Sequence, residues 1–266
     1  MPAGNPEQYE HFLGMLNGHD AGIAYVDDWL GILFAELERL GIREETAIIL
    51  TSDHGEAVGE LGMYFEHGNA SEGTTHVPLI VQWPGQHDQV YEGLLYQLDL
   101  APTCLDLLNL SIPTHWDGIS FASAVRGEPW QGREHLVLGS GIYCYQRAVR
   151  TPQYRLIRTI HPGLYPYDPL YLFDMQVDSQ QTQNLAQARP EVVAELDHLL
   201  LEWLWHFTTG AAAVTDPFQD QLRAGVAPDL YCSREYVEER LRSLGREDQL
   251  ADVRRRRDPS PPLRPW

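Results

Sequence analysis

The residues best suited to chemistry are an adjacent pair, Asp53 and His54, at the end of a short apolar run. The run is Ala47-Ile48-Ile49-Leu50, and Ser52 and Gly55 flank the pair. A carboxylate supplies a hard oxygen ligand suited to Ca²⁺ or Mg²⁺. An imidazole beside it admits borderline metals such as Mn²⁺ or Zn²⁺ as well. The pair therefore predicts a metal site, although an Asp-His pair by itself is also typical of helix caps and turns.

A strand is the element that must position this pair. The run is too short for a typical helix and rich in isoleucine, which predicts a strand buried on both faces, as in a parallel sheet. In open α/β sheets, ligands bind beyond the carboxyl ends of the strands. Gly55 lets the backbone turn away directly after the pair. We therefore expect Asp53 and His54 to converge on one point at the end of a central parallel strand.

The rest of the chain predicts an α/β part followed by an antiparallel part. Apolar residues near helical spacing predict a long helix over residues 9–41, and a second buried strand is predicted over 77–82. After Pro129, alternating apolar and polar residues are typical of a half-exposed antiparallel sheet. Its strands are predicted at 135–139, 145–150 and 153–160, and further helices at 98–110, 189–208 and 233–245.

Composition excludes some functions. A formal net charge of -19 argues against a nucleic-acid partner, because binding phosphates needs a basic face. Three widely spaced cysteines give neither a disulfide framework nor a C-x-x-C metal motif. No apolar run approaches the length of a membrane span. The opening MPAGNPEQ lacks the basic region and apolar stretch of a signal peptide, which favours a cytoplasmic location.

Five segments of the chain, taken in order, resemble the sulfatase family of the alkaline-phosphatase superfamily. They are Tyr25–Gly31 with Leu37–Gly41, Thr46–Gly85 with its SDHG and WPG motifs, Leu98–Thr103 with Asp117–Ser120, Arg147–Arg155, and Leu172–Met175 with Asp178 and Asn184-Leu185. SDHG alone is a weak signal, but five segments in the family's order are a strong one.

The resemblance, which covers residues 9–208, implies an α/β fold class. We expect an incomplete sulfatase-like (alkaline-phosphatase-like) mixed sheet flanked by helices, followed by a small antiparallel sheet with a helix. Residues 1–130 would form the carboxyl-terminal part of the catalytic domain. Residues 131–210 would form the small subdomain of antiparallel sheet and helix, and residues 211–266 a helical or irregular extension.

The resemblance also implies roles for individual residues. Asp53 and His54 match metal ligands of the family, with Ca²⁺ as the first expectation and Mg²⁺, Mn²⁺ or Zn²⁺ as alternatives. His67 stands where relatives have the Lys or His that contacts the sulfate and the leaving oxygen, so it is expected to be catalytic and substrate-binding. His76 stands where the family often has Arg, and it either reaches the substrate or is structural. Glu72 matches a glutamate expected to anchor the loop.

Other family features are expected to be missing. Sulfatases carry near their amino end a metal-binding Asp pair and then C-x-P-x-R or S-x-P-x-R, whose Cys or Ser becomes the formylglycine nucleophile. No Pro-x-Arg follows Cys104, Cys144 or Cys232 at that spacing. We therefore expect this chain to be the carboxyl-terminal part of a sulfatase, without the nucleophile or the first Asp pair.

Three functions stay open. The complete enzyme would hydrolyse a small-molecule or glycan sulfate ester, with an amino-terminal polypeptide as a candidate partner. A His at position 54, where many sulfatases have Asn, is common among phosphonate monoester and phosphodiester hydrolases of the same superfamily. The chain would otherwise be a non-catalytic fragment or subunit.

Overall fold

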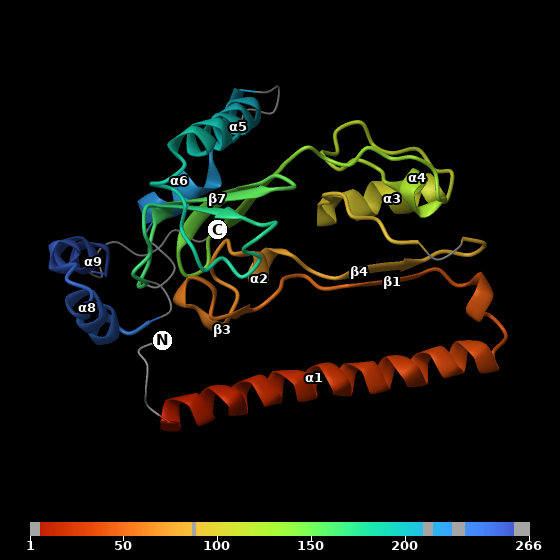
Figure 1. Cartoon of the computed structure of the whole chain (residues 1–266), viewed down its shortest axis with the longest axis horizontal. Coiled ribbons are helices and arrows are strands. Elements are labelled where there is room, and N and C mark those ends of the chain that lie inside the picture. Colours follow the sequence, from red (N-terminus) through yellow and green to blue (C-terminus); the bar gives the residue numbers. More distant parts are fainter. Residues whose placement is uncertain (1–5, 87–88, 210–214, 225–231, 258–266) are drawn as a thin grey trace. The chain divides into compact units, whose positions relative to one another are not determined.

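The computed structural model describes residues 6–86, 89–209, 215–224 and 232–257 (Figure 1). The chain forms two compact units. The first comprises Met1–Thr51, Pro78–Val90 and Ser123–Pro129, and the second comprises Ser52–Val77, Tyr91–Ala122 and Trp130–Trp266. The three-part division at residues 130 and 210 stays a prediction.

Helix α1, Pro6–Arg39, confirms the long helix predicted near the start of the chain. It ends where Gly41 adopts a φ of +70°, a left-handed conformation that glycine takes without steric cost. The N–H of Ile42 then bonds the Leu37 carbonyl at 3.1 Å and closes the helix end. The first unit continues with the 3₁₀ turn η1 (Arg43–Glu45), strands β1 (Ile48–Thr51) and β4 (Leu79–Gln82), and all but the first residue of helix α4 (Ala122–Val125).

Strands β1 and β4 confirm the two predicted strands but correct their arrangement. They pair antiparallel, with Ile48 opposite Gln82 and Thr51 opposite Leu79. Ile49 is 38% exposed and Ile80 is 61% exposed. The expectation of a parallel strand buried on both faces is therefore wrong for the described residues, in which β1 pairs with β4 alone.

The connection between the two strands gives the physical reason. Parallel neighbours need a crossover that is usually a helix packed on the sheet. Residues 52–77 instead contain only short elements: β2 (Ala57–Val58), η2 (Glu60–Gly62), β3 (Tyr64–Glu66) and the one-turn helix α2 (Glu72–Thr75). An apolar run predicts a strand, but it does not specify the direction of the partner.

The second unit is built on a four-stranded antiparallel sheet in the order β5-β6-β7-β8. Its strands are β5 (Leu136–Ser140), β6 (Tyr145–Arg150), β7 (Tyr154–His161) and β8 (Leu170–Asp174). The first three confirm the predicted strands, and β8 was not predicted as a strand. The expectation of a half-exposed sheet is wrong, because five consecutive residues of β6 are buried and each face of the sheet carries a core. The register places Val137, Val149, Leu156 and Leu172 in one row across the sheet. Leu138, Ala148, Ile157 and Tyr171 form the neighbouring row.

Each row belongs to a different core, because successive residues of a strand face opposite sides. The row containing Val149 and Leu156 packs against Val192, Leu196 and Leu200 of helix α5 (Pro190–Thr209), which confirms the predicted helix 189–208.

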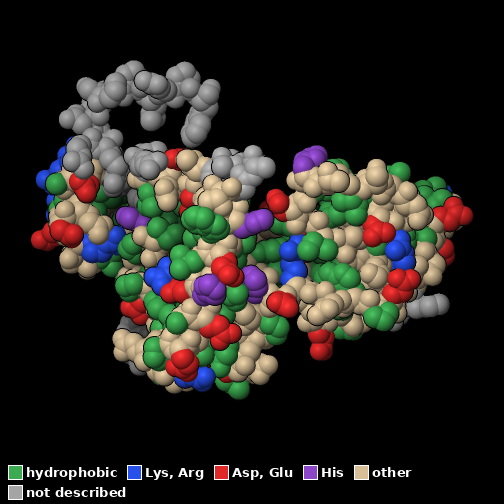
Figure 2. Space-filling model, turned by 90° about the horizontal axis from the view of Figure 1, so that it is seen from above, with side chains coloured by type: hydrophobic (Ala, Val, Ile, Leu, Met, Phe, Trp, Pro, Cys, Tyr) green, Lys and Arg blue, Asp and Glu red, His purple; other side chains and the backbone are tan. Residues whose placement is uncertain are grey.

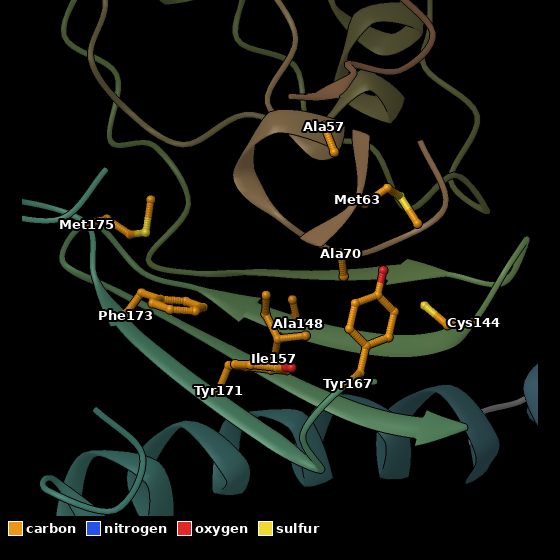
Figure 3. Close-up of a cluster of buried hydrophobic side chains, with 10 residues drawn as sticks. All are labelled: Ala57, Met63, Ala70, Cys144, Ala148, Ile157, Tyr167, Tyr171, Phe173 and Met175. Atoms are coloured by element: carbon orange, nitrogen blue, oxygen red, sulfur yellow. The ribbon is translucent and has the colours of Figure 1, made fainter. Parts of the chain in front are cut away.

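The opposite face of the sheet holds the segment that follows β1. Figure 3 shows Ala57, Met63 and Ala70 lying over the face that carries Ala148 and Ile157. Ala57, Ala70, Ala148 and Ile157 are fully buried. This packing fixes the course of residues 57–70, and so it fixes the backbone that carries His67.

The remaining elements are short. They are η3 (Gln97–Asp99), α3 (Leu100–Leu107), α6 (Pro217–Ala224), α8 (Arg234–Ser243), η4 (Glu247–Gln249) and α9 (Leu250–Arg257). Val237 and Leu241 of α8 pack against Val253 of α9. Within the described ranges, no helix has the length and apolar character needed to cross a membrane.

Candidate functional site

Asp53 and His54 follow β1 directly, and their side chains approach each other. Asp53 Oδ2 lies 3.8 Å from His54 Nε2. Asp53 Oδ1 accepts hydrogen bonds from the His54 backbone N–H at 3.0 Å and from the Ser52 hydroxyl at 3.4 Å. The bond from the His54 backbone, with the charge of the His54 ring, lowers the pKa of Asp53. The Asp53 side chain is 86% exposed and that of His54 is 43% exposed, so both are accessible to a ligand.

A second contact selects the tautomer of His54. Its Nδ1 lies 3.0 Å from the carbonyl oxygen of Gly55. A carbonyl can only accept, so Nδ1 carries the proton and donates it. In the neutral ring, Nε2 then keeps its lone pair, which is the form that binds a metal. The free nitrogen is the one nearest Asp53 Oδ2.

His67 joins this pair from another segment of the chain. Its ring stacks on that of His54, with 3.8 Å between the ring centroids and 15° between the planes. Figure 2 shows two histidine side chains side by side at the surface, next to acidic side chains. The structure therefore brings together three of the four residues that the sequence singled out for the site.

The loop between His54 and His76 owes its shape to close backbone contacts. Gly55 N–H donates to the Thr74 carbonyl at 2.9 Å. A Cβ at position 55 would lie 2.1 Å from the Gly73 carbonyl oxygen. A side chain at position 55 would therefore push the backbone segments around residues 55 and 73 apart. The Ala70 N–H donates to the Gln146 side chain at 2.9 Å, which ties the loop to strand β6.

Glu72 and Arg155 form the main anchor of this loop. Arg155 on β7 is almost fully buried. Its Nε donates to the Ala70 carbonyl at 3.0 Å, one Nη donates to the Ser71 carbonyl at 3.2 Å, and the other binds the Glu72 carboxylate. Burial opposes ionisation of Glu72, but the hydrogen bond with His76 and the charges of Arg155 and Arg150 outweigh it and lower its pKa to about 2. The anchoring role expected for Glu72 is confirmed.

Sequence reasoning did not single out Arg155. No local signal separates it from Arg158 of the same strand, because only burial in the folded chain makes an arginine need partners.

His76 takes part in the anchor as well. Its Nδ1 lies 3.2 Å from Glu72 Oε1, and this hydrogen bond raises the pKa of His76 against the opposing effect of burial. The His76 ring therefore bonds to Glu72, on the same loop, instead of extending the pair formed by His54 and His67. A substrate-binding role for His76 stays a prediction.

The donor atoms fit part of a metal shell. The 3.8 Å separation of Asp53 Oδ2 and His54 Nε2 is shorter than twice a Ca²⁺–oxygen distance of about 2.4 Å, so one cation can touch both. Ca²⁺ usually takes about six to eight oxygen ligands. In the part of the chain that the structure describes, no group of three or more His, Cys, Asp or Glu residues could hold a metal. Asp53 and His54 alone would thus give an incomplete shell.

The cysteine form of the nucleophile motif, C-x-P-x-R, does not occur in the sequence, but the serine form does. Cys104, Cys144 and Cys232 are free thiols without Pro-x-Arg at the motif spacing, and burial raises the pKa of Cys144 to about 12. The letters S-x-P-x-R occur once, in Ser260-Pro261-Pro262-Leu263-Arg264, outside the described residues. There they follow the Asp53 segment, whereas in sulfatases the motif precedes it.

Comparison with known proteins gives two family matches. Residues 2–110 match the family described as Sulfatase. Residues 59–205 match the family described as N-sulphoglucosamine sulphohydrolase, C-terminal.

Individual relatives agree with these matches. A choline-sulfatase of Rhizobium meliloti (strain 1021) is 31% identical over 175 residues, which are 63% of this chain and 32% of the relative. An arylsulfatase K of Gallus gallus is 31% identical over 188 residues, 66% of this chain and 34% of the relative. The chain therefore spans about a third of the length of the curated relatives it matches.

Among solved structures, the phosphonate monoester hydrolase of Agrobacterium radiobacter is similar at a TM-score of 0.59 and 25% identity. The similarity covers 68% of this chain and 39% of that one.

Proposed function

Because the chain belongs to the sulfatase family of the alkaline-phosphatase superfamily, we propose that it forms part of the active site of an enzyme that hydrolyses sulfate esters. The observation that carries the proposal is the stacking of His67 on His54, beside the carboxylate of Asp53. Such a reaction uses a metal that would hold the nucleophile and a sulfuryl oxygen, and a proton donor for the leaving group.

Asp53 and His54 are assigned the metal. Asp53 Oδ2 and His54 Nε2 would hold one divalent cation, with Ca²⁺ first and Mg²⁺, Mn²⁺ or Zn²⁺ as alternatives. When bound, the cation supplies Lewis-acid polarisation of an ester oxygen. The Gly55 carbonyl keeps the proton of His54 on Nδ1, so that Nε2 would be available to a cation in its unprotonated form.

His67 is assigned the role of general acid, which protonates the leaving group. An imidazolium beside the ester oxygen can donate a hydrogen bond and then a proton to the departing alkoxide. His76 is assigned a secondary role in attracting the anionic ester, which its raised pKa supports.

The nucleophile and the first Asp pair are assigned to a separate amino-terminal polypeptide. Enzymes of this family generally use formylglycine together with a divalent metal. Exposed apolar residues of the first unit support such a partner, among them Trp29 on α1 and Ile80 on β4.

A second candidate function is hydrolysis of phosphonate monoesters. His54 stands where many sulfatases have Asn, and the similar solved structure from Agrobacterium radiobacter is a phosphonate monoester hydrolase. The reaction would use the same metal pair and the same His67, but a different central atom.

Reconstitution tests the proposal. The chain would be purified together with an amino-terminal sulfatase polypeptide that carries the Asp pair and C-x-P-x-R, and assayed on an aryl sulfate and an aryl phosphonate monoester. We expect turnover of the sulfate ester, and a loss of about 100-fold or more in kcat for His67→Ala, the range typical of a general acid. His198→Ala, an exposed histidine on α5, is the matched control and should leave kcat unchanged. Phosphonate turnover alone would favour the second candidate, and full activity of His67→Ala would contradict the assignment.

A further inference from the structure

The second unit has a hollow of about 570 Å³ beside the loop that carries His67. Its walls include the end of β3, the connection between β5 and β6, the connection between β7 and β8, and helix α8. The side chains that matter here are Glu66, Tyr143, Tyr165, Tyr236, Glu239 and Arg240.

Three phenol rings form much of this wall. Burial, together with a hydrogen bond to Glu66, raises the pKa of Tyr143. Burial raises the pKa of Tyr165 to about 12. Tyr165 also stacks on Tyr167, with 5.1 Å between ring centroids and 9° between planes, which holds its ring in place. Phenol rings attract cations through their π faces, and the stacking on Tyr167 fixes the ring of Tyr165 for such a contact.

The charges of the wall favour the same kind of ligand. Glu66 and Glu239 contribute two carboxylates against one guanidinium from Arg240. The Nε of Arg240 is already used, because it donates to the Leu164 carbonyl at 3.2 Å. With a chain charge of -19 around it, the hollow attracts cations rather than anions.

The two residues that flank His67 in the sequence both contribute to the hollow or contact its wall. Glu66 precedes His67, and Gly68 follows it. The Tyr143 ring packs so closely on Gly68 that a Cβ there would lie 2.1 Å from a ring carbon. The Cys144 thiol, next to Tyr143, bonds the Gly68 carbonyl at 3.1 Å. The aromatic wall is thus held against the backbone of Gly68, the residue after His67.

We propose that this hollow binds an organic ammonium group, held by the Glu66 carboxylate and the rings of Tyr143, Tyr165 and Tyr236. In the reaction, the group would belong to the alcohol part of the substrate, which departs beside His67. This link to the substrate rests on the proposed function, whereas the binding of an ammonium group does not.

Binding to the chain itself tests the first part. Tetramethylammonium chloride would be titrated at constant ionic strength and followed by calorimetry, with tert-butanol as a neutral probe of similar shape. We expect a millimolar Kd for the cation and binding of tert-butanol at least about fivefold weaker, the size of a cation–π contribution at a partly exposed site. Glu66→Gln should weaken cation binding by about fivefold or more, since it removes the charge and keeps the shape. Glu195→Gln, an exposed carboxylate on α5, is the matched control and should bind like the unaltered chain.

Several results would overturn the proposal. Equal binding of tert-butanol would show that shape alone is recognised, and unchanged binding in Glu66→Gln would place the cation elsewhere. Tighter binding of methyl sulfate would make the hollow an anion site at Arg240, and no binding of any probe would mean that the hollow takes no small ligand.

The link to the substrate has its own test in the reconstituted enzyme. Glu66→Gln should raise KM for an ammonium-bearing sulfate ester and leave KM for a neutral aryl sulfate unchanged. If the enzyme hydrolyses no sulfate ester at all, the proposed function fails while the binding result still stands. If both KM values change equally, the hollow is not the ammonium subsite of that reaction.

Discussion

Glu72 shows how a single residue holds the candidate site without taking part in the chemistry. Its carboxylate binds Arg155 and Arg150 on the sheet and His76 on its own loop. The Glu72 side chain is 18% exposed, so these charges are only weakly screened by water. The loop that carries His67 is therefore fixed to the sheet by an ion-pair network and not by apolar packing alone.

The lowered pKa of Glu72 predicts a specific acid sensitivity. Its pKa is about 2 when folded against an ordinary value of 4.5. The stability that Glu72 contributes is complete above pH 4.5 and is lost as the pH falls from there towards 2. Glu72→Gln should lower the free energy of unfolding near neutral pH by about 3 kcal/mol, because it leaves buried Arg155 without its counter-charge.

Urea unfolding measured between pH 7 and pH 3 checks this prediction. The difference in unfolding free energy between the unaltered chain and Glu72→Gln should become smaller as the pH approaches 3, because the unaltered chain loses the stability that ionised Glu72 contributes. Glu195→Gln should follow the unaltered chain at every pH. A Glu72→Gln curve that runs parallel to that of the unaltered chain would show that Glu72 does not titrate as described.

At the scale of elements, strand β7 links the sheet to the site. Arg155 near its start reaches the loop, while Arg158 on the same strand pairs with half-buried Asp197 of α5. The two arginines share a strand but differ in burial, since the Arg155 side chain is 1% exposed and that of Arg158 is 44% exposed. This difference makes them a matched pair for mutation.

Arg155→Lys should loosen the loop. Lysine keeps the charge but lacks the planar set of donors that binds Ala70, Ser71 and Glu72 together. We expect a loss of about 2–4 kcal/mol in the free energy of unfolding and faster amide hydrogen exchange in residues 69–75. Arg158→Lys should change stability by less than about 0.5 kcal/mol. Unchanged exchange in Arg155→Lys would mean that the loop is held by other contacts.

The edges of the β1–β4 pair predict self-association of the isolated chain. In the described residues, each of these two strands has one bonded edge, and Ile80 lies exposed on β4. An open apolar edge is a template for pairing with another chain. Ile80→Lys should therefore raise the monomer fraction measured by light scattering, while Val90→Lys, which adds the same charge outside the strands, should not. Equal molar masses for all three proteins would exclude this edge as the interface.

Sequence periodicity predicted elements better than their arrangement. The spacing of Leu196 and Leu200 reflects burial, which local pattern records. The alternation in β6 located the strand but not its burial, because polar Gln146 and Arg147 are buried too. The antiparallel direction of β1 and β4 depends on how residues 52–77 fold, and no period in the sequence carries that information. For the site, Asp53 and His54 were predicted as metal ligands because they are adjacent at the end of an apolar run. His67 was predicted as a catalytic residue from the family resemblance. The ring contact between His54 and His67 depends on packing of the intervening loop against a sheet more than 60 residues further on, which no local pattern encodes.

At the scale of the whole molecule, the distribution of apolar surface distinguishes the two units. The second unit contains a sheet with a core on each face. The first unit exposes large apolar side chains along α1, including Tyr25, Val26, Trp29 and Ile32. Contiguous apolar surface of this kind marks an interaction site. It fits the proposed amino-terminal polypeptide, which would also supply the nucleophile.

The central claim is that Asp53 and His54 hold one cation with His67 beside them, and paramagnetic NMR tests it most directly. The eleven histidines of the chain would be labelled with ¹⁵N and titrated with Mn²⁺, which broadens resonances of nuclei close to it even when it binds weakly. The account predicts that His54 and His67 broaden first, that His198 on α5 does not, and that Asp53→Asn abolishes the effect. Broadening centred on other histidines, or unchanged broadening in Asp53→Asn, would contradict the metal assignment.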